Sequence, residues 1–341
     1  MLDLYQTALE TANALGCILM GVSLCAYVQK WVPRLILPRL CVADVGSLLV
    51  AFVVFCLPGV NRIAFYLWIV RSVFGSIYHA TVFGAPLFGF FTFAIPVLCY
   101  HALYALRHRC AWLNRFRVSD RNHPRDSPSE QVRNAYRTLE WKALLYVIKI
   151  SLMMDVLMLF PQLCRLGWYV KDDDPRIAES HPNALPTSAW HIIVSVTSYV
   201  LVIDFCSYWM HRLVHSYPCL YRYHKRHHEF HEVSILAAAY THPIDILLTF
   251  ILPMLVGMLI VRPHTMIAWQ VLFAKQLHFA YDHGGYAPEV HPWGWLLSPL
   301  PLCRNSVHHD LHHSRNTGNY SAHYTIFDRL FGSFIPPIHT K

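Results

Sequence analysis

The chain has 341 residues, of which 55% are hydrophobic and only 14% are Asp, Glu, Lys or Arg, and its formal net charge is +8. A soluble domain carries about 25% charged residues, so this composition excludes an ordinary soluble protein and favours a membrane-embedded one. A basic chain binds either nucleic acid or an anionic membrane surface. We favour the membrane and expect no nucleic acid, because the basic residues flank apolar runs and form no separate basic helix.

The ten cysteines are scattered singly and form no Cys-x-x-Cys pair. Several lie within apolar runs, where Cys behaves as a small hydrophobic residue. This pattern predicts a reduced, intracellular protein without a disulfide framework. The apolar run after Ala14 has no basic segment before it, so we expect no cleavable signal peptide.

Apolar runs of about 20 residues predict helices that cross a membrane. Such runs occupy residues 14–29, 41–60, 86–106, 143–163, 191–210, 246–261 and 265–281. The stretch 63–77 carries Arg71 in its middle and is interpreted as interfacial. The sequence therefore predicts an all-α fold, a polytopic transmembrane helical bundle.

The charged connections predict the orientation of this bundle. The segment 107–140 contains eight arginines against four acidic residues and is expected in the cytosol, whereas the acidic segment 164–189 is expected in the lumen. The spans on either side of Arg262-Pro263 would form a hairpin that returns to the cytosolic side. The histidine-rich segments would then form a helical cap on the cytosolic face. We divide the chain into an N-terminal region, 1–140, without a recognised motif, and a catalytic domain, 141–341.

Three histidine clusters have the spacing of one helical face. His211 and His215 are four residues apart, and the other clusters repeat an i, i+3, i+4 pattern. The second and third clusters are His224, His227 and His228, and His309, His312 and His313. A helix with this spacing directs its imidazoles toward one point, so the sequence predicts a metal site.

The number of histidines bears on the kind of metal. Imidazole binds Fe, Zn, Cu and Ni, so the ligand type alone does not name the metal. A zinc site usually has four ligands, so eight imidazoles imply two metals. Of the usual pairs, two irons can activate dioxygen, whereas zinc has no redox chemistry.

Three further residues are candidates for the same site. His283 and His242 stand at the two ends of the predicted hairpin and are expected as additional ligands. Asp204 lies in an apolar span, seven residues before His211, where a carboxylate is costly and usually functional. Because a metal-bound imidazole commonly donates its second N–H to a carboxylate, we expect Asp204 to orient His211 or His215.

These motifs resemble the histidine boxes of the fatty acid hydroxylase/sterol desaturase superfamily. The resemblance covers about residues 190–335, and its motifs are highly specific. They are residues 204–215 (DFCSYWMHRLVH), 224–228 (HKRHH), 308–313 (HHDLHH), 318–320 (GNY) and 327–332 (FDRLFG). Residues 282–286 (DHGGY) resemble the hydroxylase version of that region, whereas Asp245 stands where many hydroxylases have Glu and C5 desaturases have Asp.

The resemblance implies a non-haem di-iron enzyme of the endoplasmic reticulum membrane with a cytosolic active site. It also implies dioxygen as oxidant and electrons from NAD(P)H, often through cytochrome b5 and its reductase. The expected reaction is hydroxylation of an unactivated C–H bond in a membrane-soluble lipid, such as a sterol, terpenoid, sphingoid base or acyl chain, that enters from the bilayer. A desaturase similar to the sterol C5 desaturases is the alternative.

Other classes of protein fit the sequence less well. A membrane zinc protease needs His-Glu-x-x-His, but His228-Glu229 is followed by Phe230-His231. A bis-histidine haem carrier needs single histidines on opposing spans, and a metal transporter needs ligands along a path within the membrane. A metal- or lipid-binding membrane protein without turnover is the non-enzyme alternative, and the retention of all eight box histidines argues against it.

Overall fold

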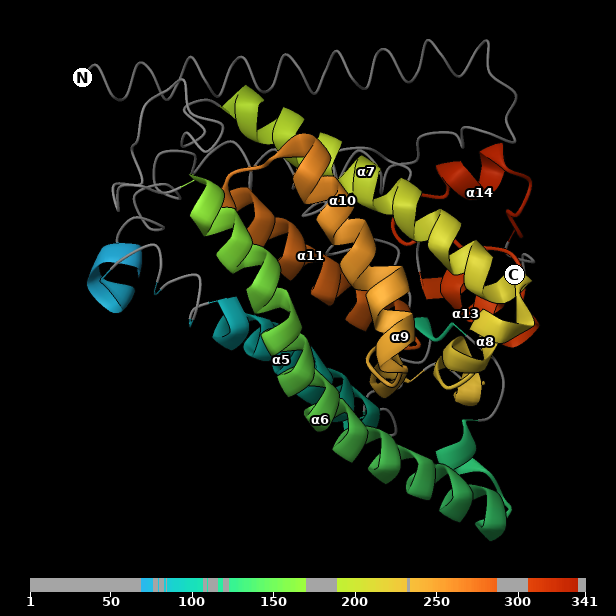
Figure 1. Ribbon diagram of the computed structural model, residues 1–341. Helices are drawn as coiled ribbons and strands as arrows, with labels where there is room; N and C mark the ends of the chain where they lie inside the picture. Colours follow the sequence, from blue (N-terminus) through green and yellow to red (C-terminus); the bar gives the residue numbers. More distant parts are fainter. Residues whose placement is uncertain are drawn as a thin grey trace.

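The computed structural model in Figure 1 describes residues 69–75, 79, 83, 85–106, 109, 116–118, 123–169, 189–231, 234–286 and 306–336. Within these residues the fold is helical, without a strand; a single bridge pairs Arg117 with Tyr286. The prediction of an all-α fold is confirmed for this part of the chain. The predicted spans at 14–29 and 41–60 lie outside the described residues, as does most of the interfacial stretch 63–77, where η1 is Ile69–Phe74.

Long helices form the body of the described structure. They are α5 (Ala85–Leu106), α6 (Glu130–Tyr169), α7 (Ala189–Ser216), α11 (Thr265–His283) and the continuous run of α9 (Pro243–Ile246), η7 (Leu247–Ile251) and α10 (Leu252–Val261). Every apolar run predicted between residues 86 and 281 lies within one of them. The expected division at residue 140 falls inside α6, which continues through it.

One stretch of the described residues, Pro243–Val261, is long and apolar enough to cross a membrane. It ends at Arg262, which adopts a left-handed conformation with φ of 50°. Pro263 follows and cannot continue a helix, so the chain turns back into α11. This is the hairpin expected from the sequence. A bundle with several membrane spans stays a prediction.

Helices α7 and α10 pack against each other and lie side by side in Figure 1. A Cβ atom on Gly257 of α10 would lie 2.7 Å from the Tyr199 ring of α7, so only glycine permits this approach. The contact buries Tyr199, Ile203 and Met254 in one core with residues of α11. A second buried cluster joins α6 to η6 (Ile235–Ala238).

Short elements gather at one end of the long helices, where α7 and α11 end and α9 begins (Figure 1). They are α8 (Pro218–His224), η5 (His227–Glu229), η6, α13 (Ser306–Arg315) and α14 (Ile326–Leu330). This end of the molecule carries the histidine clusters. The fold therefore brings the histidine clusters together at one end of the long helices.

Candidate metal centre

The predicted ligands come from separate elements that meet at this end. The last two turns of α7 carry His211 and His215, and α11 ends at His283. The second cluster occupies the end of α8 and the η5 turn, and the third lies on α13. Nine of the ten predicted ligands are thereby brought together.

These nine histidines divide into two groups, and the potential ligand atoms within each group all lie within 4.8 Å of one another. The five-histidine group is His211, His215, His224, His228 and His312. The four-histidine group is His227, His283, His309 and His313. The five-histidine group combines residues of α7, α8, η5 and α13, and the four-histidine group combines residues of η5, α11 and α13, so neither forms before the fold does.

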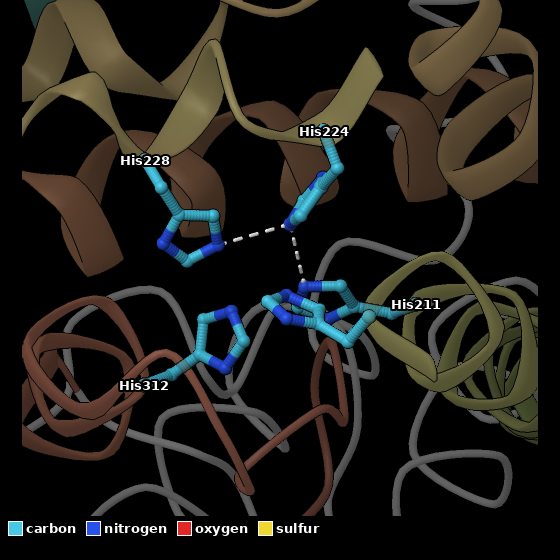
Figure 2. Close-up of side chains that lie close together, drawn as sticks. His211, His224, His228 and His312 are labelled. Carbon is cyan, nitrogen blue, oxygen red and sulfur yellow. Dashed lines mark hydrogen bonds between the residues drawn. The ribbon is translucent and has the colours of Figure 1, made fainter. Parts of the chain in front are cut away.

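Figure 2 shows how imidazoles of the five-histidine group face one another. Nδ1 of His224 donates to Oδ2 of Asp245 over 2.8 Å, and Nδ1 of His211 donates to the Tyr320 carbonyl over 2.8 Å. Both acceptors are oxygens, so each ring carries its proton on Nδ1 and a lone pair on Nε2. Yet the two Nε2 atoms lie only 3.2 Å apart. Two lone pairs facing each other at this distance repel unless a cation lies between them.

The four-histidine group repeats this arrangement. Nδ1 of His227 donates to the Ala237 carbonyl over 2.9 Å, and Nδ1 of His283 donates to the Phe279 carbonyl over 2.8 Å. Their Nε2 lone pairs lie 3.4 Å apart. In both groups, therefore, a cation between the Nε2 atoms would remove the repulsion between their lone pairs.

The spacing of the nitrogens also fits a metal. Two imidazole nitrogens about 2.1 Å from one ion lie about 3.0 Å apart at a right angle and about 3.4 Å apart at a tetrahedral angle. Besides the two pairs above, Nε2 of His224 and His228 are 3.1 Å apart, and Nε2 of His309 lies 2.7 Å from that of His283. The donor set and its spacing thus fit one metal ion in each group.

The histidines are held in the neutral form that binds metal. Burial lowers the pKa of His211, His224, His312 and His313 well below the usual value, and the neighbouring imidazoles lower it further. Burial lowers the pKa of His215 to about 4. At neutral pH these rings are therefore uncharged, and binding a metal to them releases no proton from an imidazolium.

A carboxylate that the sequence analysis did not assign to the site contacts a ligand directly. Asp245 is 2% exposed, and it accepts hydrogen bonds from His224 and from the hydroxyl of Thr241. A carboxylate on the second nitrogen of a metal-bound imidazole fixes its tautomer and raises its basicity. The signal was available, because Asp245 is an acidic residue at the start of an apolar run.

Two predicted site residues have other positions. His242 lies outside both groups; its Nδ1 accepts the backbone N–H of Ile244 over 3.2 Å and caps α9. The carboxylate of Asp204 accepts the backbone N–H groups of residues 322–324 over 2.7–2.9 Å. The sequence predicted that Asp204 orients His211 or His215, but Nδ1 of His211 donates to the Tyr320 carbonyl instead.

A cavity of about 180 Å³ opens beside both groups. Members of both groups line one part of it, namely His211, His224, His227, His283 and His309. The remaining wall is mainly apolar and comes from α5, α6, η7 and α11, including Phe90, Ile150, Phe250 and Phe279. Thr249 and Phe250 belong to the π-helical turn η7, a type of turn that is frequent at functional sites. An apolar ligand in this cavity would therefore lie against the metal-binding nitrogens.

The fold and the site define a helical protein with two buried histidine groups that fit metal ions, beside an apolar cavity. The sequence profile of the fatty acid hydroxylase family matches residues 196–333. A cholesterol 25-hydroxylase-like protein of Danio rerio is 30% identical over 202 residues, which are 58% of this chain and 74% of that protein. The chain belongs to the fatty acid hydroxylase/sterol desaturase superfamily, as its motifs predicted.

Other relatives match a shorter region. Methylsterol monooxygenase 1 of Rattus norvegicus is 32% identical over 136 residues, 39% of this chain and 44% of that protein. A very-long-chain aldehyde decarbonylase of Oryza sativa subsp. indica is 35% identical over 163 residues, 44% of this chain and 56% of that protein. The chain thus spans about half the length of these relatives. No solved structure gives a significant match.

Proposed function

We propose that this protein is a di-iron, dioxygen-dependent hydroxylase of an unactivated C–H bond in a membrane-soluble lipid. The observation that carries the proposal is the shared cavity, which joins two buried all-histidine groups to an apolar pocket. When bound, a pair of irons supplies the activation of dioxygen that zinc cannot supply. The family to which the chain belongs supports the same class of reaction.

The protein's own residues have three tasks in this reaction. Asp245 and the backbone carbonyls hold the imidazoles in one tautomer, with the Nε2 atoms of His211 and His224 directed at each other. The aromatic wall of the cavity, including Phe250 and Phe279, packs the lipid and excludes water from the reacting carbon. Gln276 adds a polar group to this wall. Binding and orientation are thus the protein's contribution, while the metals carry out the oxidation.

Exposed apolar side chains support a membrane location. Several large hydrophobic residues on the outer faces of the long helices are more than two-fifths exposed, which is costly in water. They include Phe90, Phe91, Ile95 and Leu98 on α5, Trp141, Leu145 and Ile148 on α6, Val194 and Phe205 on α7, and Leu259 and Ile260 on α10. Phe90 also lines the cavity, so a lipid in the bilayer would meet the cavity from this side.

The rest of the cellular setting is part of the proposal. The family and the arginine-rich segment 107–140 support a multi-pass protein of the endoplasmic reticulum membrane with its histidine groups on the cytosolic face. Electrons would come from NAD(P)H through cytochrome b5 and its reductase, as the family resemblance implies. A desaturase is the second candidate, favoured by the Asp at position 245.

Metal analysis and lipid profiling test the proposal together. The purified chain should hold near two irons, and cells that express it should accumulate a lipid with a mass gain of one oxygen. A loss of two hydrogens would favour the desaturase. A purified protein with haem, or with no iron after loading under reducing conditions, would overturn the di-iron proposal. His308, which lies on α13 outside both groups, offers a matched control because its substitution should leave the iron content unchanged.

A further inference from the structure

The segment that joins α13 to α14, residues 316–324, runs along the five-histidine group; we call it the strap. Its carbonyl oxygens bond ligands of that group. Nδ1 of His312 donates to Gly318 and Nδ1 of His211 donates to Tyr320, each over 2.8 Å. The strap therefore orients imidazoles of the five-histidine group.

The four-histidine group takes backbone partners from other elements. His227 is bound to Ala237 of η6, and His283 is bound to Phe279 within α11. A change in the position of the strap should consequently weaken metal binding by the five-histidine group more than by the four-histidine group. The role of the strap can be measured from this difference in metal retention.

Two buried carboxylates hold the backbone N–H groups of the strap. Asp328 accepts from Tyr320 over 2.8 Å and from Ser321 over 2.9 Å. Asp204 accepts from the next three residues over 2.7–2.9 Å. The exposed fractions of Asp328 and Asp204 are 1% and 0%. Five consecutive N–H groups thus end on two carboxylates, one from α14 and one from α7.

The peptide unit between Tyr320 and Ser321 connects Asp328 to a metal-binding histidine. Its N–H, on Ser321, donates to Oδ2 of Asp328, and its C=O, on Tyr320, accepts from His211. A negative charge on the N–H side polarises a peptide and strengthens the hydrogen bond at its carbonyl. One peptide unit therefore separates Asp328 from the His211 imidazole. Through this peptide Asp328 should orient the imidazole as a directly bound carboxylate would.

Asp204 holds the peptide between Ala322 and His323, and the carbonyl of this peptide has a different partner. The N–H of His323 donates to Oδ1 of Asp204, and the Ala322 carbonyl of the same peptide accepts from Nε2 of His278 over 3.1 Å. His278 belongs to neither histidine group. The two carboxylates are alike in burial and in the kind of bond they make, but the peptide held by Asp328 leads to His211, whereas the Ala322–His323 peptide held by Asp204 leads to His278.

We propose that Asp328 is a positioning residue for the five-histidine group, acting on His211 through the Tyr320–Ser321 peptide. The proposal rests on the proposed function, because it requires a metal in each group. Asp204 fastens the other half of the strap, and the Ala322–His323 peptide that it holds leads to His278. The motif at residues 327–332 (FDRLFG) would thereby help to position a metal-binding histidine through Asp328.

The test is the metal content of Asp328→Asn and Asp204→Asn after loading with iron and dialysis against a chelator. Asp328→Asn should lose one iron of two, with about 10–100-fold weaker retention, as expected for the loss of a carboxylate behind a ligand. Asp204→Asn should retain close to two. Equal losses in both variants, or two irons retained in Asp328→Asn, would overturn the proposal.

Further variants identify the group that loses its metal. Combining Asp328→Asn with His211→Ala should cause no additional loss, whereas combining it with His309→Ala should remove both irons. Asp328→Glu should restore part of the retention. If Asp328→Asn fails to fold, Ser333→Ala serves instead, because the Ser333 hydroxyl donates to Oδ1 of Asp328 over 2.8 Å. Ser333→Ala should weaken the retention of iron by the five-histidine group by a smaller factor. Unchanged retention would count against the proposal. A wild-type protein without two irons would refute the proposed function itself.

Discussion

Asp245 and His224 form a buried pair, with 2.8 Å between Oδ2 of the carboxylate and Nδ1 of the imidazole. They are 21 residues apart in the sequence and lie on α9 and α8. The carboxylate fixes the proton on Nδ1, so Nε2 of His224 is free to bind a metal together with His211 and His228. The following predictions depend on this arrangement and on the division of the histidines into two groups.

Asp245→Asn should weaken metal retention by about 10–100-fold, because an amide supports the imidazole less than a carboxylate does. Asp245→Glu should retain more metal than Asp245→Asn, since it keeps the charge. Iron per chain, measured at a series of chelator concentrations, checks both. The matched control is Glu229→Gln, which removes a partly exposed carboxylate bound to Tyr240 beside the same cluster. Equal retention in Asp245→Asn and Glu229→Gln would contradict the assigned role.

His227→Ala and His312→Ala should each abolish lipid oxidation, because each removes a ligand from a different group. Both proteins should remain in the membrane fraction and should keep the metal of the intact group. Product lipids from microsomes and iron per chain are the two readouts. His308→Ala, on the same helix as His312, is the control and should oxidise lipid normally. Turnover at the wild-type level in either ligand variant would remove that histidine from the site.

The metal-free protein should lose stability as the pH falls from about 6.5 toward 4. The unfolded chain protonates its histidines near pH 6.5, whereas burial lowers the pKa of folded His215 to about 4 and those of His211 and His312 well below 6.5. In this window the unfolded state therefore binds more protons, and stability rises with pH. Thermal unfolding of the metal-free protein between pH 7.5 and 4.5 measures the effect. A melting temperature that stays constant across this range would show that the imidazoles are not buried as described.

Phe250→Trp should reduce lipid oxidation without removing metal. Phe250 lines the cavity from η7, and a larger ring there takes up space that the substrate needs. The expected result is a lower kcat/KM for lipid with unchanged iron per chain. Phe91→Trp on the half-exposed face of α5 is the control and should leave both quantities unchanged. A loss of iron together with activity in Phe250→Trp would indicate disruption of the fold rather than a filled cavity.

Patterns in the amino-acid sequence predicted the features of this protein that depend on local geometry. Apolar runs predicted the helices between residues 86 and 281, and the histidine spacing predicted a metal site. The expectation that each triplet points toward one site on one helix was wrong, because each triplet divides between the two groups and the second triplet lies on α8 and η5. The motifs were specific enough to indicate the family, which the comparisons confirm. These patterns are formed by residues close together in the sequence, so they do not depend on how distant parts of the chain pack.

The way in which these helices and histidines combine depends on contacts between distant parts of the folded chain. His227 and His228 are neighbours in the sequence but belong to different groups, because the η5 turn directs their rings apart. Helical spacing suggested that Asp204 orients His211 or His215, yet its carboxylate accepts N–H groups 118–120 residues further along the chain. Contacts over such separations depend on how α7, α9 and the strap pack together, and no local pattern encodes that packing. The pairing of His224 with the Asp245 carboxylate likewise depends on how α8 and α9 pack, so the structure was needed to identify it.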